Sequence, residues 1–273
     1  MKSKVFSALC VAGALMATTA SAQQSITVSG STSVTEVMEV LAETYHKQHS
    51  STFIEVQGTG SSAGVKAAKN GTSMFGMASR ELKESEKEAS ITETVIARDG
   101  IAVVVNNANP LADLTVEQIA KIYRGDVKNW SEVGGENKPI VVVTRDTASG
   151  TRGAFEDIMS LKRKINGMSV SAISQRAQVG NGNGVVKTIV ANNPFAIGYI
   201  SLGSIDTSLK AVKVNGVAPT SEAVSAGTYQ VARPFLVLNK VGEPSPEAEN
   251  FLAWIMSADG QKIVSKQGYV PVN

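Results

Sequence analysis

The chain has 273 residues, of which 42% are hydrophobic and 18% charged, an ordinary globular composition sufficient for one large or two medium domains. It carries 26 lysine and arginine residues against 24 acidic ones, and only 5% of it is aromatic. This balanced charge and the scarcity of aromatic residues argue against a nucleic-acid-binding protein.

The N-terminus has the three parts of a secretory signal peptide. Two early lysines precede the apolar and small-residue stretch Val5–Thr19, and Ala20-Ser21-Ala22 matches the A-x-A cleavage pattern. We therefore expect residues 1–22 to be a cleaved signal peptide and the mature protein to be periplasmic; the apolar stretch is too short for a membrane anchor. The single cysteine, Cys10, would leave with the signal, so the mature chain would have no disulfide or thiolate metal site.

The first predicted strand ends in a turn of small polar residues that leads into a helix. Ser25–Ser29 alternates as strands do, and Gly30–Ser33 connects it to a helix with one apolar face. Ser33 and Glu36 have the spacing of a capping box, in which the two side chains bond the helix's first backbone N–H groups.

The next two predicted strands end in the same way. Thr52–Val56 runs into the glycine- and serine-rich segment Gly58–Gly64, which opens a short helix. Met74–Ala78 is a short apolar strand followed by Ser79, which we expect to cap a helix that begins at Arg80.

The fourth turn of this kind carries the most chemistry. The β-branched run Ile140–Thr144 predicts a buried strand, and apolar residues from Phe155 onward recur at helical spacing. Between them lie a guanidinium fork, two hydroxyls and a glycine that admits a ligand to the backbone, at Arg145, Ser149, Gly150 and Thr151. At a helix N-terminus, where the dipole is positive, this combination predicts capture of a small oxyanion without bond breaking.

The ends of parallel strands meet at one crevice in open α/β sheets, so four such turns favour one shared binding site. Ile91–Ile96 and Ile101–Val105 are predicted as separate strands, the second apolar enough for a central or crossing position. Val231–Leu238 is a further long extended run. Gly180–Gly184 opens another helix but lacks the spacing of a dinucleotide-binding loop.

The residues that catalysis would require are not found near the fourth turn. The two histidines, His46 and His49, end the first helix, far from the start that would face the site, and they have no third metal ligand nearby. We also find no convincing cluster of aspartate and histidine for a metallophosphatase. We therefore expect no enzyme activity, no cofactor and no metal site.

With these motifs in view, the chain resembles the phosphate-binding proteins of high-affinity phosphate ABC importers over nearly all of its mature length. The Arg-x-x-x-Ser-Gly-Thr element is the most specific of five matching segments: Gly30–Ser33, Gly58–Ser62, Phe75–Ser79, Arg145–Thr151 and Ala196–Tyr199.

This resemblance implies an α/β fold, a two-lobed periplasmic binding protein (type II-like) whose lobes are joined by crossing hinge strands. Residues 23–102 with 232–273 would form lobe one, and residues 103–231 would form lobe two. The two long apolar runs, 101–105 and 231–238, would be the hinge strands.

The resemblance also implies a ligand set. Carried over position by position, the family's phosphate ligands fall on Thr32, Ser33, Ser61, Arg145, Ser149, Gly150 and Thr151. Ser79 and Arg80 stand where many family members have Ser-Asp, and in those the Asp accepts the proton of bound phosphate. Arg80 would either add charge to the site or turn outward. Asp99, just before the expected crossing strand, is our candidate for the missing carboxylate; the alternative is a solvated turn aspartate.

The function expected from this resemblance is capture of inorganic phosphate and its delivery to the membrane permease of an ABC importer. We expect a monomer with no nucleic-acid partner. The nearest alternative is a receptor for another oxyanion, such as sulfate or molybdate. A secreted phosphatase that uses Ser149 and an extracellular adhesion protein are alternatives from other classes.

Overall fold

The computed structural model describes residues 24–272, so the expected signal peptide lies outside the described residues. Its main sheet runs in the order β2-β1-β3-β13-β4-β10-β6-β9, and β11 pairs with β4. The strands of this sheet are β1 (Gln24–Gly30), β2 (Thr52–Gly58), β3 (Phe75–Ala78), β4 (Ile91–Val105), β6 (Val141–Arg145), β9 (Gln178–Gly180), β10 (Ala196–Ser201), β11 (Lys210–Ala211) and β13 (Ala232–Lys240).

Two small two-stranded sheets accompany the main one: β5 (Asp113–Leu114) with β12 (Lys213–Val214), and the hairpin of β7 (Lys162–Ile165) with β8 (Met168–Ser171). The helices are α1 (Thr32–Gln48), α2 (Ser61–Asn70), α3 (Val116–Arg124), α4 (Gly150–Ile158), α5 (Asn183–Ala191), α6 (Ser221–Ser225), α7 (Pro246–Ile255) and α8 (Ala258–Lys266), with short 3-10 turns η1 (Glu84–Glu86), η2 (Trp130–Val133) and η3 (Leu202–Ser204). None of the helices within residues 24–272 is both long and apolar enough to cross a membrane.

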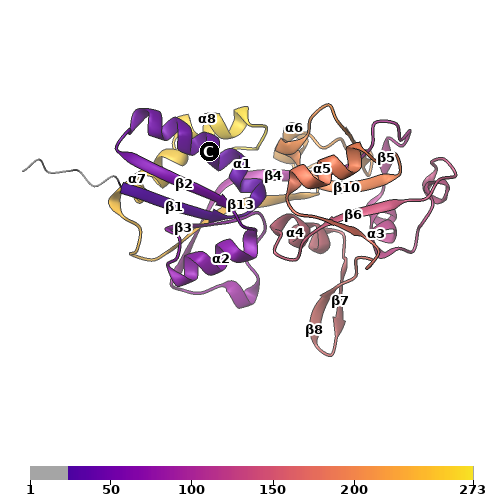
Figure 1. The fold of residues 1–273 in the computed structure, drawn as a ribbon, viewed down its shortest axis with the longest axis horizontal. Helices are drawn as coiled ribbons and strands as arrows, with labels where there is room; N and C mark the ends of the chain where they lie inside the picture. Colours follow the sequence, from indigo (N-terminus) through magenta and orange to yellow (C-terminus); the bar gives the residue numbers. More distant parts are fainter. Residues whose placement is uncertain (1–23, 273) are drawn as a thin grey trace, which may run out of the picture.

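The molecule has two lobes, each with its own core (Figure 1). The first lobe is built on β1, β2 and β3 with α1, α2, α7 and α8, and its core includes Leu41, Phe75 and Phe251. The second is built on β6, β9 and β10 with α3 to α6, and its largest core cluster includes Tyr123 and Phe155. This is the two-lobed α/β fold expected from the resemblance; the residue boundaries of the lobes stay a prediction.

Strand β4 passes from one lobe into the other. Its residues 91–100 pair antiparallel with β13, and residues 101–105 pair antiparallel with β10. The sequence analysis predicted two strands here, and the break between them was wrong. The polar residues between the two predicted strands are paired where they lie: the Arg98 backbone bonds that of Val270, and the Asp99 side chain meets a buried arginine. These polar residues therefore have partners inside the protein and do not interrupt the strand.

The helix predicted after Ser79 is also wrong. Between β3 and β4 the structure has only the 3-10 turn η1, and Ser79 instead bonds other serines: its backbone N–H donates to Ser61 Oγ at 3.1 Å, and its hydroxyl accepts from Ser31 Oγ at 2.8 Å. Tertiary partners have replaced the local cap that the sequence pattern indicated.

The capping box predicted for the first helix is a third correction. Ser31 is the N-cap of α1, and its Oγ accepts from the backbone N–H groups of Ser33 and Val34. Because Ser31 performs the capping, the side chains of Ser33 and Glu36 are free to reach the second lobe.

Candidate anion-binding site

The N-termini of four helices meet between the lobes: those of α1 and α2 from the first, and of α4 and α5 from the second. Ser33 Oγ on α1 lies 3.0 Å from Thr151 Oγ1 on α4, and Asn183 Nδ2 on α5 donates to Ser33 Oγ at 3.2 Å. The first backbone N–H groups of each helix have no intrahelical acceptor, and the helix dipole is positive there. Four helix N-termini at one place therefore favour the binding of an anion.

Glycine at position 150 allows α4 to approach the first lobe. A Cβ on Gly150 would lie 2.1 Å from Ser61 Oγ and 2.7 Å from Ser79 Oγ, closer than any real contact. The backbone of the two lobes also bonds directly at this point, since Ser62 N–H donates to Ala148 O at 3.1 Å. Gly150 therefore lies against the serines that end β3 and begin α2, as a shared site requires.

Arg145, the last residue of β6, lies at the centre of this arrangement and is only 1% exposed. Its Nη2 donates to Thr32 Oγ1 at 2.8 Å and its Nη1 to Asn183 Oδ1 at 3.0 Å, so the guanidinium contacts both lobes. Its Nε is buried without a hydrogen-bond partner, the only side-chain nitrogen or oxygen of that kind within residues 24–272. A buried donor of this kind is costly unless a ligand accepts from it.

Arg145 also forms no ion pair among the described residues. The ion pairs nearest the site, among the residues described, join Arg80 to Glu86, Arg152 to Glu156 and Arg233 to Asp99; none includes Arg145. Burial lowers the pKa of the Arg145 guanidinium, yet an arginine stays protonated in proteins at neutral pH. A buried positive charge without a carboxylate partner is what an oxyanion can neutralise.

The remaining predicted ligand residues surround this guanidinium. Ser149 is the N-cap of α4, and its Oγ accepts from the backbone N–H of Arg152 at 3.2 Å. Ser33, Ser61, Ser79 and Thr151 are each at most 1% exposed. The structure thus brings together eight of the ten residues that the sequence analysis named: Thr32, Ser33, Ser61, Ser79, Arg145, Ser149, Gly150 and Thr151.

Arg80 lies nearby but points its charge elsewhere. Its two Nη atoms form a bidentate pair with Glu86 at 2.6 and 2.8 Å, and they also donate to Glu81 O and Ser62 Oγ. Its Cδ packs beside Gly153 at the start of α4. Of the two roles considered from sequence, this geometry supports the outward one, so we no longer count Arg80 among the ligands.

Asp99 is buried too, but its carboxylate is already engaged. Oδ2 accepts from Arg233 Nη2 at 2.8 Å and from Ser201 Oγ at 2.9 Å, and Oδ1 accepts from Leu202 N–H at 3.2 Å. Burial raises the pKa of this carboxyl, against the opposing effect of Arg233. Asp99 is not the solvated turn residue considered from sequence, and both oxygens of the proposed proton acceptor are engaged by the protein: Asp99 is the counter-charge of a buried arginine.

Four polar residues of the site were missed in the sequence analysis: Asn183, Arg233, Glu36 and Ser204. Asn183 follows Gly182, whose φ of 90° lets the chain turn sharply from β9 into α5. The glycine-asparagine run was recognised as the start of a helix and rejected as a dinucleotide loop; counted as a fifth polar turn at a helix start, it would have indicated Asn183. No local pattern marks Arg233, which is the second residue of β13 and donates to Ser79 Oγ at 3.2 Å.

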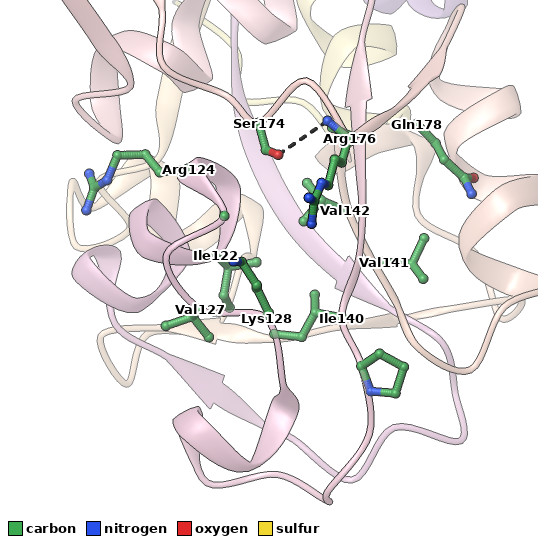
Figure 2. A pocket seen from close by; sticks show the side chains of 13 residues that line it. Ile122, Arg124, Val127, Lys128, Ile140, Val141, Val142, Ser174, Arg176 and Gln178 are labelled. Carbon is green, nitrogen blue, oxygen red and sulfur yellow. Dashed lines mark hydrogen bonds between the residues drawn. The ribbon is translucent and has the colours of Figure 1, made fainter.

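A cavity of about 170 Å³ lies beside the site where the lobes meet, lined among others by Arg80, Ser149 and Arg152. A larger cavity of about 560 Å³ lies apart from it, between α3 and β6 (Figure 2). Its apolar wall includes Ile122 and Val142, and Ser174 Oγ there accepts from the Arg176 backbone N–H at 3.3 Å. It contains no predicted ligand residue, so size alone does not identify the site.

Among the described residues, no histidine or carboxylate forms a hydrogen bond with the Ser149 hydroxyl, which accepts from the backbone N–H of Arg152. His46 Nδ1 contacts Thr52 O at 2.8 Å, and the His49 ring stacks on Tyr45 with centroids 4.1 Å apart, both at the far end of α1. No group of three or more histidine, cysteine, aspartate or glutamate side chains that could hold a metal occurs among the described residues.

The fold and the site together define a class: a two-lobed binding protein with an anion site between its lobes. The model of the PBP superfamily domain matches residues 17–259. The chain is 31% identical to the phosphate-binding protein PstS of Bacillus subtilis over 92% of this chain and 82% of that one. It is 28% identical to PstS of Borreliella burgdorferi over 90% of each chain.

The solved structures that are similar to this chain include receptors of phosphate transporters. A putative phosphate ABC transporter substrate-binding protein with bound phosphate from Clostridium perfringens is 43% identical, with a TM-score of 0.86 over 92% of this chain and 100% of that one. An ABC-type phosphate transport receptor from Vibrio cholerae is also 43% identical, with a TM-score of 0.77 over 90% and 99%. The chain belongs to the PstS family of phosphate-binding proteins within the PBP superfamily, which confirms the resemblance seen in the sequence.

Proposed function

We propose that this protein captures inorganic phosphate between its lobes and delivers it to the permease of an ABC importer. The observation that carries the proposal is Arg145, which is buried without an ion-pair partner and with an unpartnered Nε where four helix N-termini meet. A tetrahedral oxyanion supplies the acceptors and the negative charge that this arrangement lacks. The proposed ligands are Thr32, Ser33, Ser61, Arg145, Ser149, Gly150 and Thr151, with Ser79 beside them.

Several features support phosphate over the alternatives. The relatives are named for phosphate binding, and the one from Clostridium perfringens was solved with phosphate bound. Sulfate and molybdate receptors remain the competing class, because the site has the donors that any tetrahedral oxyanion needs. A secreted phosphatase is disfavoured, because the Ser149 hydroxyl caps α4 and forms no hydrogen bond with a histidine or carboxylate among the described residues.

The setting of this function is also part of the proposal. Residues 1–22 act as a signal peptide, the mature protein works in the periplasm as a monomer, and it uses no cofactor and no nucleic-acid partner. Family membership supports an extracytoplasmic receptor. The balanced charge of the chain supports the absence of a nucleic-acid partner.

We further propose that the lobes, residues 23–102 with 232–273 and residues 103–231, close on the ligand by bending at β4 and β13. Both strands pass between the lobes, and the ligands come from both sides. Small-angle scattering should show a smaller radius of gyration with phosphate than without it. An unchanged profile at saturation would contradict hinge closure but not binding.

Calorimetric titration of the mature chain with phosphate, sulfate and molybdate tests the function. We expect tight binding of phosphate, much weaker binding of the other two, and no release of product from a chromogenic phosphate monoester. Preference for sulfate or molybdate would move the protein to the competing receptor class. Turnover that disappears in Ser149→Ala would make it an enzyme.

A further inference from the structure

Glu36 lies on α1 of the first lobe, but its carboxylate contacts the second lobe. Oε1 accepts from Asn183 Nδ2 at 2.9 Å, and Oε2 accepts from Ser204 Oγ at 2.6 Å. Both partners are buried, Asn183 at the start of α5 and Ser204 in η3. The carboxylate thus bridges the lobes beside the anion site without belonging to the proposed ligand set.

The side chain that Glu36 contacts is also the one that holds Arg145. Asn183 presents Oδ1 to Arg145 Nη1 at 3.0 Å and Nδ2 to Glu36. An amide can turn by half a rotation and exchange these two atoms, so its neighbours decide which way it points. A carboxylate only accepts and a guanidinium only donates; the two ions therefore define one orientation of the amide between them.

Other groups contact the same amide, but none of them defines its direction independently of Glu36. Ser33 Oγ lies 3.2 Å from Nδ2, and its hydroxyl can donate or accept. Ser204 Oγ lies 2.9 Å from Nδ2, and it accepts there because its one proton is donated to Glu36 Oε2. The Ser201 backbone N–H lies 3.5 Å from Oδ1, at the limit of a hydrogen bond. Glu36 is the charged side chain that contacts Nδ2, and Arg145 is the charged side chain that contacts Oδ1.

We propose that Glu36 is a positioning residue for anion binding: through Asn183 it fixes the Arg145 guanidinium, and by bridging the lobes it slows release of the ligand. The inference rests on the proposed phosphate site. Simple electrostatics predicts that removing a negative charge near an anion site strengthens anion binding. If Glu36 instead positions Arg145, removing its charge should weaken phosphate binding.

The test compares Glu36→Gln with Glu39→Gln, which removes the same charge from an exposed position of α1. Phosphate association and dissociation are followed by stopped-flow fluorescence of the mature chain. Hydrogen bonds to charged groups are strong enough that we expect Glu36→Gln to release phosphate roughly tenfold to a hundredfold faster, with little change in association. We expect Glu39→Gln to behave as the wild type.

A double-mutant cycle with Asn183→Ala separates positioning from a general effect on α1. If Glu36 acts through Asn183, Glu36→Gln should have little further effect on phosphate dissociation in the Asn183→Ala background. Fully additive effects, tighter phosphate binding by Glu36→Gln, or equal behaviour of Glu36→Gln and Glu39→Gln would each overturn the inference while leaving the phosphate site intact. Failure of the wild type to bind phosphate would instead overturn both. Thermal melts of each variant without phosphate verify that it is folded.

Discussion

Two buried arginines, Arg145 on β6 and Arg233 on β13, differ in whether the protein supplies an ion-pair partner, and this difference gives one a role in ligand binding and the other a structural role. They are 1% and 4% exposed, so both have lost most of their hydration. Arg233 is neutralised within the protein by Asp99, with Nη2 at 2.8 Å from Oδ2, whereas Arg145 has only neutral partners. A buried arginine that is already paired can hold two strands together, but one that is unpaired retains its attraction for an anion.

The largest expected effect comes from removing the partner of Arg233. Asp99→Asn leaves that guanidinium without an ion-pair partner, like Arg145, and loss of one member of a buried pair costs about 3–5 kcal/mol of the free energy of unfolding. Chemical denaturation of the protein without ligand measures this loss, with Glu93→Gln, exposed on the same strand, as the control.

Asp99→Asn also tests where phosphate selectivity arises. Because both Asp99 oxygens are engaged by protein donors, we expect the ratio of phosphate to sulfate affinity to stay near that of the wild type. A large fall in that ratio with little loss of stability would return Asp99 to the ligand set.

Removing Arg145 should weaken phosphate binding strongly and reduce stability less than Asp99→Asn does. A charge-assisted hydrogen bond contributes roughly 1.5–3 kcal/mol, so Arg145→Ala should weaken phosphate binding by about tenfold to a few hundredfold. Calorimetry measures the affinity, and Arg124→Ala, on the exposed end of α3, is the control. Without ligand, we expect this variant to lose less stability than Asp99→Asn, since it removes a buried charge that has no ion-pair partner instead of leaving one behind. Wild-type phosphate affinity in Arg145→Ala would show that the site lies elsewhere.

A smaller change tests the orientation of the same guanidinium. Thr32→Val keeps the shape of the side chain but removes the oxygen that accepts from Arg145 Nη2 at 2.8 Å. Loss of one such bond costs about 1 kcal/mol, so phosphate affinity should fall roughly fivefold. Thr35→Val removes a hydroxyl from the next turn of α1, where its Oγ1 donates to Ser31 O, and should change affinity less. Equal effects of the two variants would contradict a specific role for Thr32.

The smallest effect concerns Arg80, a third arginine that has its own carboxylate. Burial raises the pKa of the Glu86 carboxyl, but hydrogen bonds from Arg80 and from the Lys83 N–H outweigh it, so the net pKa lies below the ordinary value of 4.5. The unfolded chain then takes up the proton first as pH falls. The stabilisation is present above pH 4.5 and is lost as pH falls through the folded-state pKa.

Thermal melts over an acidic pH series test this pair. The wild type should lose stability more steeply below pH 4.5 than Glu86→Gln, in which that position cannot titrate. Phosphate affinity at neutral pH should be the same in both, because Arg80 points away from the site. A clear loss of phosphate affinity in Glu86→Gln would restore Arg80 to the ligand set.

Much of the site could be predicted because its chemistry is local. A helix N-terminus, a glycine that admits close approach and a serine that caps are each specified within a few residues, as at Ser149, Gly150 and Thr151. The strand-to-helix turns were recognised for this reason, and their convergence followed from the general rule for α/β sheets. The error at Ser33 concerned only which residue caps α1, whereas at Ser79 the predicted helix itself does not form.

What the sequence could not determine was the pairing of charges. The Arg145–Thr151 motif indicated Arg145 from the sequence, but no local pattern shows which carboxylate pairs with Arg80 or with Arg233. The roles of Arg80 and Arg233 depend on their ion pairs with Glu86 and with Asp99, which is 134 positions from Arg233 along the chain. Electrostatic energy depends on distance in space and on burial, and both are defined only when the strands have assembled. The sequence by itself determined that an oxyanion site exists and which turns form it. Only the tertiary structure decided that Glu86 and Asp99 pair with Arg80 and Arg233 and that Arg145 has no such ion pair among the described residues.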